Sequence, residues 1–138
     1  MAYQNYFTFF TLFFSFYILI SKTFAIQNPV VFDIRNDLPS NNLGDLAVSC
    51  NRSDYMSHIN VGDHYNRTFQ VGQSWECDAA WSRYFTFGWE VYQEKRDKGH
   101  PTIYWSVRED GFYHSLDASH WKLLALWYTE WLPRLCII

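Results

Sequence analysis

Two pairs of histidines have a spacing that could serve metal binding. His58 and His64 lie six residues apart, and so do His114 and His120. Because side chains at even spacings share one face of a continuous strand, each pair could place two imidazoles on the same side of a sheet. However, Gly62 bends the chain between the first pair, and no Cys-x-x-Cys motif accompanies either pair. We therefore predict hydrogen-bonded or solvent-facing histidines and no metal site.

Catalysis would require a nucleophile, a base and an orienting group. The sequence has no Gly-x-Ser-x-Gly motif and no glycine-rich phosphate loop. We predict no catalytic residues and no cofactor, so the protein is not expected to be an enzyme. Solvent-exposed strand faces and turns explain the acidic residues that could otherwise pair as acid and base: Glu90, Glu94, Asp97, Glu109 and Asp110.

The N-terminal segment has the pattern of a secretory leader. Phe7–Ile20 is a fourteen-residue apolar run, and Lys22 and the cleavage-like sequence Thr23–Ala25 follow it. A membrane-spanning helix needs roughly 20 apolar residues, which this run does not reach. We predict cleavage after Ala25, so that residues 1–25 are a signal peptide and the mature protein is secreted, extracellular and not inserted in a membrane. No Lys or Arg precedes the run, which leaves a retained signal anchor as the alternative.

The mature chain would be one acidic domain. Removal of the leader leaves 113 of the 138 residues, near the commonest domain size. Lys22 is the only charged leader residue, so the mature chain has 10 basic and 14 acidic residues and a net charge of −4. The basic residues are scattered without a run of five or more. Nucleic acid and anionic membranes are therefore not expected partners.

Three cysteines remain in the mature chain, where secretion would favour disulfides. Cys50 and Cys77 each end a strand-like apolar segment, and we predict that they form a bridge. Cys136 is then an odd thiol, which implies a free thiol or an intermolecular bridge. A bridge from Cys136 to one of the inner cysteines is the alternative.

Two sequons predict N-glycosylation on the protein surface. They are Asn51-Arg52-Ser53 and Asn66-Arg67-Thr68, and neither has proline at its middle position. The predicted acceptors are Asn51 and Asn66. The alternative for Asn66 is a strand position that is never modified.

Period-two alternation of apolar residues predicts an all-β fold. Such alternation marks half-buried strands, and turn residues separate the runs at short, regular spacing. We predict an antiparallel β-sandwich of about seven to eight strands in two sheets. The strand-like runs cover residues 30–35, 46–50, 59–61, 65–71, 75–79, 84–92, 103–107 and 112–113.

Two local patterns predict details of the sheets. Asp110-Gly111 between alternating apolar runs is typical of a type I′ hairpin, in which both central residues have positive φ. In the run 84–92, four apolar residues at odd positions are expected to share one face: Phe85, Phe87, Trp89 and Val91.

The segment from Ser119 onward is too dense in apolar residues for a solvated strand. It fits either a last strand through Trp127 with a short apolar extension, or a helix from Ser119 to the break at Pro133. We place the domain at residues 26–127 and the apolar C-terminal extension at 128–138. The extension is expected to pack against the domain, and a partner-binding or membrane-surface patch is the alternative.

Trp75, Trp81, Trp89 and Trp105 are predicted to pack in the core. Exposed Trp or Tyr on a secreted sandwich can also stack on sugar rings, so glycan binding is the alternative function. A ring exposed beside hydrogen-bonding side chains would favour that alternative, and burial of every Trp would oppose it.

A series of motifs follows one order along residues 30–127. The most specific block contains Trp89–Tyr92, Arg96-Asp97 and Trp105–Tyr113. The earlier motifs are Val31–Leu38, Leu46–Asp54, His58, Gly62, Tyr65, Phe69 and Trp75–Cys77. In this order they resemble the plant self-incompatibility S-protein homologue family, which consists of small secreted β-sandwich proteins. Relatives commonly carry two further cysteines, whereas the interval Lys98–Tyr104 has none, so this chain is expected to be less stable or to depend more on aromatic packing.

The resemblance implies a secreted signalling ligand of a flowering plant. In the founding members of the family, the protein is a pistil determinant recognised by a partner on pollen, and no catalytic site is known to carry over. We therefore expect a cell-surface receptor as the partner. Contact is expected through two loops, because loops on a rigid scaffold commonly carry recognition: Asn51–Ser57 and Trp81–Tyr84, with the candidate residues Arg52, Asp54, Tyr55, Ser82 and Arg83.

Overall fold

The computed structural model describes residues 6, 8–16, 28–40, 44–53, 55–70, 72 and 74–129. The predicted cleavage position Ala25, the odd cysteine Cys136 and the candidate contact residue Asp54 lie outside these residues. Residues 8–16, in the predicted leader, are helical and exposed. Within the ranges described, no helix has the length and apolarity that a membrane crossing requires.

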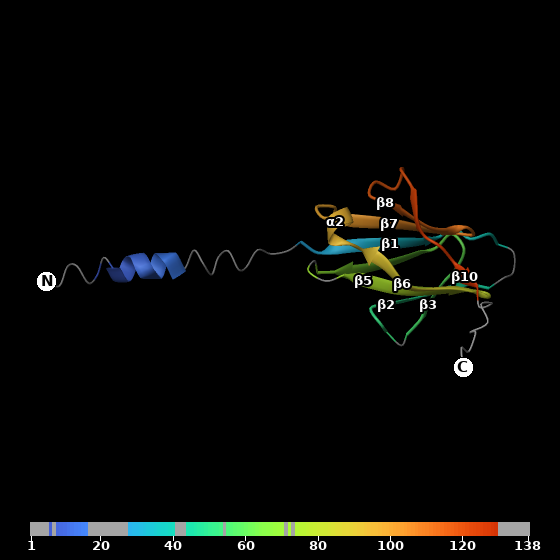
Figure 1. Cartoon of the computed structure of the whole chain (residues 1–138), viewed down its shortest axis with the longest axis horizontal. Coiled ribbons are helices and arrows are strands. Elements are labelled where there is room, and N and C mark those ends of the chain that lie inside the picture. Colours follow the sequence, from blue (N-terminus) through green and yellow to red (C-terminus); the bar gives the residue numbers. More distant parts are fainter. Residues whose placement is uncertain are drawn as a thin grey trace, which may run out of the picture.

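The chain folds into two five-stranded sheets, which confirms the predicted β-sandwich but with ten strands rather than seven to eight. Figure 1 shows the sheets as two layers, with β1 and β7 in one layer and β2, β5 and β6 in the other. The first sheet contains, in spatial order, β4 (His64–Phe69), β1 (Val30–Asn36), β7 (Thr102–Arg108), β8 (Gly111–Ser115) and β9 (Lys122–Ala125). The second contains β10 (Tyr128–Thr129), β6 (Tyr84–Tyr92), β5 (Trp75–Trp81), β2 (Leu46–Cys50) and β3 (Ser57–Ile59), and the short helix α2 (Glu94–Asp97) joins β6 to β7.

One strand pair departs from the predicted antiparallel arrangement. β1 lies between β4 and β7, and its pairing with β7 is parallel, with Val31 opposite Thr102 and Asn36 opposite Val107. Parallel neighbours need a long connection, and here the connection contains β4 and four of the five strands of the second sheet: β2, β3, β5 and β6. Alternation along a strand does not distinguish the two directions, so the sequence pattern could not show this pair.

Aromatic side chains fill the space between the sheets. Trp81, Trp89 and Trp105 are 2%, 3% and 1% exposed, which confirms the predicted core positions. Trp75 is half-buried and packs against Phe69, with ring centroids 5.1 Å apart. Each large ring buried this way removes much apolar area from water, which is the main stabilising contribution in so small a domain.

Asn36, at the end of β1, fixes the connection from β3 to β4. Its side-chain amide donates to Ile59 O at 2.7 Å, and its Oδ1 accepts from the N–H of Leu38 at 3.0 Å. Its backbone carbonyl accepts from Gly62 N at 2.7 Å. Because Asn36 is fully buried, these bonds satisfy polar groups that would otherwise be desolvated without partners.

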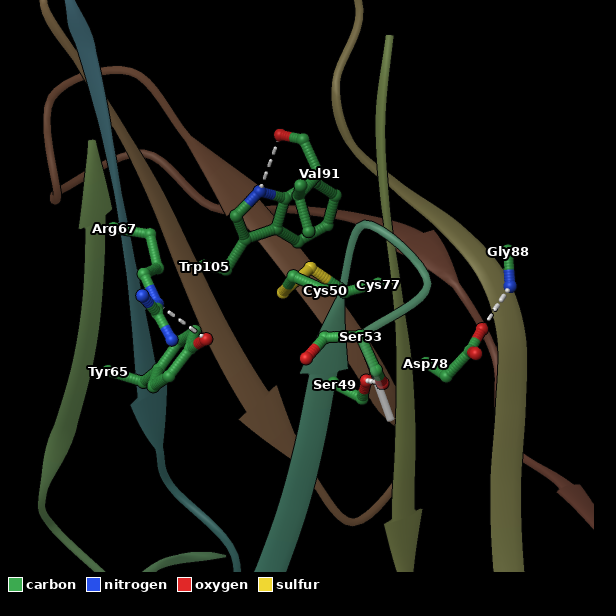
Figure 2. The surroundings of a disulfide bond; sticks show 10 residues. All are labelled: Ser49, Cys50, Ser53, Tyr65, Arg67, Cys77, Asp78, Gly88, Val91 and Trp105. Atoms are coloured by element: carbon green, nitrogen blue, oxygen red, sulfur yellow. Dashed lines mark hydrogen bonds between the residues drawn. A yellow bond between two sulfur atoms is a disulfide. The ribbon is translucent and has the colours of Figure 1, made fainter. Parts of the chain in front are cut away.

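A bulge in β6 makes one sequence prediction wrong. Cys77 pairs with Trp89 and Ala79 pairs with Thr86, so two residues of β6 stand opposite Asp78 alone. One of them, Gly88, has φ +62, and its N–H donates to Asp78 Oδ1 at 2.8 Å (Figure 2). The extra residue reverses the alternation. Phe85 and Phe87 therefore do not share the buried face of Trp89 and Val91, and Phe87 is 72% exposed.

The hairpin between β7 and β8 forms where predicted, but its turn is not type I′. Arg108 pairs with Gly111, so Glu109 and Asp110 are the central residues, and neither has positive φ. Gly111, with φ +145, is required for another reason. A Cβ at this position would lie 2.5 Å from Ala125 O and 2.7 Å from Leu123 Cδ1, so glycine permits the close approach of β9.

We expect Gly111→Ala to lower the free energy of unfolding by about 2–3 kcal/mol, because β9 must move away from β8 or the methyl group must overlap its backbone. Urea unfolding of the mature protein measures this loss. Gly99→Ala is the matched control, since Gly99 also has positive φ but a Cβ added there would meet no atom of the surrounding fold within 4 Å. Equal losses for the two variants would contradict the close-approach explanation.

The segment after Ser119 continues as strands as far as it is described. β9 pairs with β8, and β10 pairs with β6 through Tyr128 opposite Phe85. The alternative of a single helix from Ser119 is therefore wrong for residues 119–129. Trp127, between the two strands, donates its Nε1 hydrogen to Arg108 O at 2.8 Å and packs on Phe112.

Candidate functional site

The predicted disulfide forms between neighbouring strands of one sheet. Cys50 on β2 lies directly opposite Cys77 on β5, with a Cα–Cα distance of 4.0 Å, and both are buried. Figure 2 shows the two side chains meeting beneath the loop that follows β2. Cys50 ends its strand as predicted, whereas Cys77 is the third residue of a β5 that continues to Trp81. The bridge therefore anchors the start of the β2–β3 loop to the middle of the second sheet.

Local hydrogen bonds shape the β2–β3 loop, residues 51–56. Asn51 N donates to Glu76 O at 2.9 Å, Ser49 Oγ donates to Ser53 O at 2.5 Å, and Tyr55 N donates to Ser53 Oγ at 3.2 Å. Asn51 and Arg52 both have left-handed backbone conformations, with φ of 57° and 53°. Non-glycine residues adopt this conformation at an energetic cost, so the bonds and the disulfide must hold the turn.

A cleft of about 240 Å³ lies between this loop and β4. On the β4 side, Arg67 Nε donates to the hydroxyl of Tyr65 at 2.8 Å, and its guanidinium lies 5.4 Å from the Tyr65 ring centroid (Figure 2). On the loop side, Tyr55 is 74% exposed. The cleft is lined by Cys50, Asn51, Ser53, Tyr55, Tyr65, Arg67, Thr68 and Trp75. Aromatic rings, a cation and hydroxyl groups thus converge on one fixed surface, which is the composition of an interaction hot spot.

The structure brings only part of the predicted contact set together. Arg52 and Tyr55 lie at the disulfide end of the second sheet, whereas Ser82 and Arg83 form the two-residue turn between β5 and β6. Five residues of chain separate Cys77 from Ser82, which corresponds to about 16 Å of extended strand. The flanking residues of the predicted second loop are not loop residues, because Trp81 and Tyr84 pair within the sheet and Trp81 is buried.

Both sequon asparagines lie on the surface. Asn51 is exposed in the turn that begins the β2–β3 loop. Asn66 is exposed on β4, which is an edge strand of the first sheet, opposite Asp33.

Each of three histidines contacts one carboxylate rather than another histidine. His64 Nδ1 lies 2.7 Å from Asp33, His114 Nε2 lies 2.8 Å from Asp97, and His120 Nδ1 lies 2.6 Å from Asp117. His58 is exposed on β3. In the part of the chain that the structure describes, no group of three His, Cys, Asp or Glu side chains could hold a metal ion.

Ser119, His120 and Asp117 lie within hydrogen-bond distance of one another, as in a hydrolase triad. The geometry does not fit that chemistry. Ser119 Oγ and Asp117 Oδ2 both contact the same imidazole nitrogen, Nδ1, at 2.9 and 2.6 Å. A general base needs one nitrogen for the nucleophile and the other for the orienting carboxylate. The imidazole is also fully accessible, with 90% of its side chain exposed, rather than held in a cleft.

Sequence reasoning missed a buried ionic network at the α2 corner. Asp97, predicted to lie on a solvated turn, is completely buried. Arg96 donates to both its carboxylate oxygens, at 2.8 and 2.7 Å, and the His114 imidazole lies 2.8 Å from Oδ1. Arg96 also lies over the ring of Trp105, at 5.3 Å. This network, Arg96–Asp97–His114, connects the β6–β7 segment to β8. It lies next to the interval Lys98–Tyr104, where the resemblance leads us to expect two more cysteines in relatives.

The network controls the ionisation of Asp97. Burial by itself would raise the pKa of this carboxyl group. Hydrogen bonds from His114, Arg96 and the backbone N–H of Gln93, together with the charge of Arg96, outweigh burial and lower the pKa of Asp97 from 3.8 to about 2. The carboxylate is therefore charged across the whole physiological range, as a structural partner for Arg96 should be.

The two layers of strands and the disulfide within one of them define a small, disulfide-bonded β-sandwich protein. A sequence profile of the family described as plant self-incompatibility protein S1 matches residues 31–127, more than half of the chain, and the chain belongs to that family.

One solved structure is also similar to this chain. It is described as that of SPH (self-incompatibility protein homologue) proteins, a widespread family of small, highly stable, secreted proteins from plants. The TM-score is 0.53 at 21% sequence identity, and the match covers 75% of this chain and 98% of that chain. None of the curated proteins matches the chain in sequence. The secreted location predicted from the leader agrees with the description of these relatives.

Proposed function

We propose that this protein is a secreted ligand that a cell-surface receptor recognises through the β2–β3 loop and the adjoining face of β4. The observation that carries the proposal is Tyr55, an aromatic ring 74% exposed beside a cleft whose loop wall is anchored by the Cys50–Cys77 bridge. Exposed aromatic and arginine side chains on a rigid support lose little conformational entropy on binding, so they commonly dominate interface energies.

The charges around the cleft define the complementary surface of the receptor. Arg67 on β4 lines the cleft, and Arg52 is exposed in the adjoining loop between the lining residues Asn51 and Ser53, although the predicted mature chain is acidic as a whole. The hydrogen bond from Arg67 to the Tyr65 hydroxyl uses the Nε hydrogen of the guanidinium. The N–H groups of its two terminal nitrogens can therefore donate to an acceptor on the partner. A receptor loop with a carboxylate beside an aromatic or aliphatic side chain fits this arrangement.

N-glycosylation at Asn51 and Asn66 belongs to the same proposal. Exposure of both asparagines supports it. A glycan on Asn51 would border the cleft, because Asn51 is one of the residues that line it. Removing that glycan should therefore change receptor affinity more than removing a glycan on Asn66.

Binding of fluorescently labelled mature protein to plant protoplasts tests the proposal. We expect Tyr55→Ala to weaken binding at least 30-fold, the effect of a hot-spot residue worth about 2 kcal/mol. Arg83→Ala is the control, since Arg83 is a surface residue at the opposite end of the sheet. Retained binding by Tyr55→Ala would contradict the proposed surface, and loss of binding by Arg83→Ala would instead place the contact at the β5–β6 turn, the second loop predicted from the sequence. Thermal unfolding should be unchanged in both variants.

Glycan binding is a second candidate, favoured by the same exposed tyrosine beside the hydrogen-bonding groups of Arg67 and Ser53. Trp side chains do not support it, because every Trp from Trp75 to Trp127 is buried or half-buried. The protoplast experiment separates the candidates: protease treatment of the cells abolishes binding to a protein receptor, whereas a glycan ligand is removed by glycosidases and competes as a free oligosaccharide.

A further inference from the structure

A second surface, remote from the cleft, exposes apolar side chains at the edge where β6, β9 and β10 meet. We call it the edge patch and define it as Phe87, Leu124, Leu126 and Tyr128. These residues are 72%, 38%, 55% and 60% exposed. They border a groove of about 470 Å³ whose inner wall includes Trp89, Trp105 and Trp127. Contiguous apolar surface of this kind on a small domain normally marks something that covers it.

Strand pairing leaves this edge of the second sheet open. As far as the structure describes the chain, to Thr129, β10 pairs with only Tyr84 and Phe85 of β6. From Thr86 to Glu90, β6 instead borders the groove. Phe85 joins the exposed rings on either side of it, because its centroid lies 5.0 Å from that of Phe87 and 6.5 Å from that of Tyr128. The β6 bulge at Gly88 contributes directly, since it turns Phe87 outward rather than into the core.

We propose that the C-terminal residues of this chain, 130–138, cover the edge patch. The segment begins directly after Thr129, which pairs with Tyr84 at one end of the patch. Five of its nine residues are large and apolar: Trp131, Leu132, Leu135, Ile137 and Ile138. An apolar segment tethered beside an apolar groove has a high effective concentration there, so a cover supplied by the same chain outcompetes a free partner of similar composition.

The length and the sequence of the segment suit a return along β6. β10 is antiparallel to β6, so the chain leaves Thr129 toward the turn at Ser82 and must reverse to reach Phe87. Pro133 is suited to such a reversal, because it fixes φ at the value required by the second residue of common turns. Seven residues separate Thr129 from Cys136, about 23 Å of extended chain, whereas Phe87 lies three residues, about 10 Å, along β6 from Tyr84.

The odd cysteine makes the position of the segment measurable. If residues 130–138 lie on the patch, Phe87→Cys places a thiol within reach of Cys136, and the two should form an intramolecular disulfide in a glutathione redox buffer. Trypsin cleavage after Arg134 releases Leu135–Ile138, so the bridge appears as that peptide joined to the peptide containing residue 87. Phe87 is largely exposed, so the substitution should leave the fold intact.

Val61→Cys is the matched control, because Val61 is also exposed but precedes β4 on the side of β3, the opposite edge of the second sheet. We expect at least ten-fold more bridge to Cys136 from residue 87 than from residue 61. Equal yields would show an undocked segment and overturn the proposal. A disulfide-linked dimer as the main product of Phe87→Cys would also overturn it, in favour of a second copy as the cover.

A dye-binding measurement on the full mature chain tests independently whether residues 130–138 cover the edge patch. If the segment covers the patch, Leu135→Ser with Ile137→Ser should uncover it and increase the fluorescence of an apolar dye several-fold. If the segment is undocked, its own apolar side chains already bind dye, and the same substitutions should decrease the fluorescence. A decrease overturns the proposal. Neither result depends on the receptor-binding cleft, so the function proposed above can fail independently.

Discussion

Replacing Asp97 with asparagine is expected to lower the free energy of unfolding by about 3 kcal/mol. The substitution removes the negative charge that compensates Arg96, and breaking a buried ion pair in this way typically costs about 3–5 kcal/mol. We take the lower end of that range because the Arg96 side chain is 21% exposed and can be partly hydrated. Chemical denaturation at pH 7, followed by tryptophan fluorescence, measures the loss.

Asp117→Asn is the matched control for that experiment. Asp117 also contacts a histidine, at 2.6 Å, but its side chain is 51% exposed and the histidine side chain 90%. Because water screens exposed ion pairs, this substitution should cost far less than Asp97→Asn. Comparable losses for the two variants would mean that the α2 corner contributes no more than an ordinary surface ion pair.

The same network predicts how stability falls in acid. The pKa of Asp97 is lower in the folded state, about 2, than the ordinary value of 3.8, so the unfolded chain binds the proton more tightly. The stabilisation is therefore fully present well above pH 4 and is lost as the pH falls toward 2, with a size of about 2 kcal/mol. Denaturation midpoints measured between pH 6 and pH 2 should show this fall, and the Asp97→Asn variant should lack that part of it.

Removing the disulfide has the other large expected effect. Cys50 and Cys77 are 27 residues apart, and closing a loop of that length is worth about 3.5 kcal/mol in the chain-entropy model. Cys50→Ala with Cys77→Ala should lower the free energy of unfolding by this amount. It should also weaken receptor binding, because the bridge fixes the loop that carries Tyr55.

Cys136→Ala is the comparison for the double variant, since Cys136 takes no part in the bridge. It should leave the denaturation midpoint unchanged. If the double variant unfolded at the same denaturant concentration as the native protein, the bridge would not stabilise the fold, and the predicted loss in the free energy of unfolding would be wrong.

Local sequence patterns identified most of the strands, but not how the strands are combined. Alternation of apolar residues located β1, β2 and β4 to β8. It could not reveal that β1 and β7 run in parallel, since the period is the same in both directions. It also gave the wrong face for Phe87, because the bulge depends on the positive φ of a single glycine and on a side chain from the neighbouring strand, Asp78.

The candidate site was only partly accessible to sequence reasoning. The disulfide and the loop that begins at Asn51 followed from the cysteine positions and polar composition. The cleft needed β4 as its second wall, and nothing local to Tyr65 or Arg67 indicates which loop lies opposite. The Asp97 network was missed because an acidic residue in a charged segment normally faces water, and the adjacent Arg96 was the one local signal of a pair.

The central position of β1 sets the order in which the protein can be completed. Val31 and Thr102, opposite each other in the parallel pair, are 71 residues apart in the chain. At roughly 5–20 residues per second, the ribosome delivers the second of them about 4–14 s after the first. During that interval β1 can pair with β4 along one edge, but its other edge lacks β7, while the strands that carry Cys50 and Cys77 can already meet. A nascent chain can therefore acquire its covalent link before the first sheet is complete, and chaperones would encounter the open edge of β1.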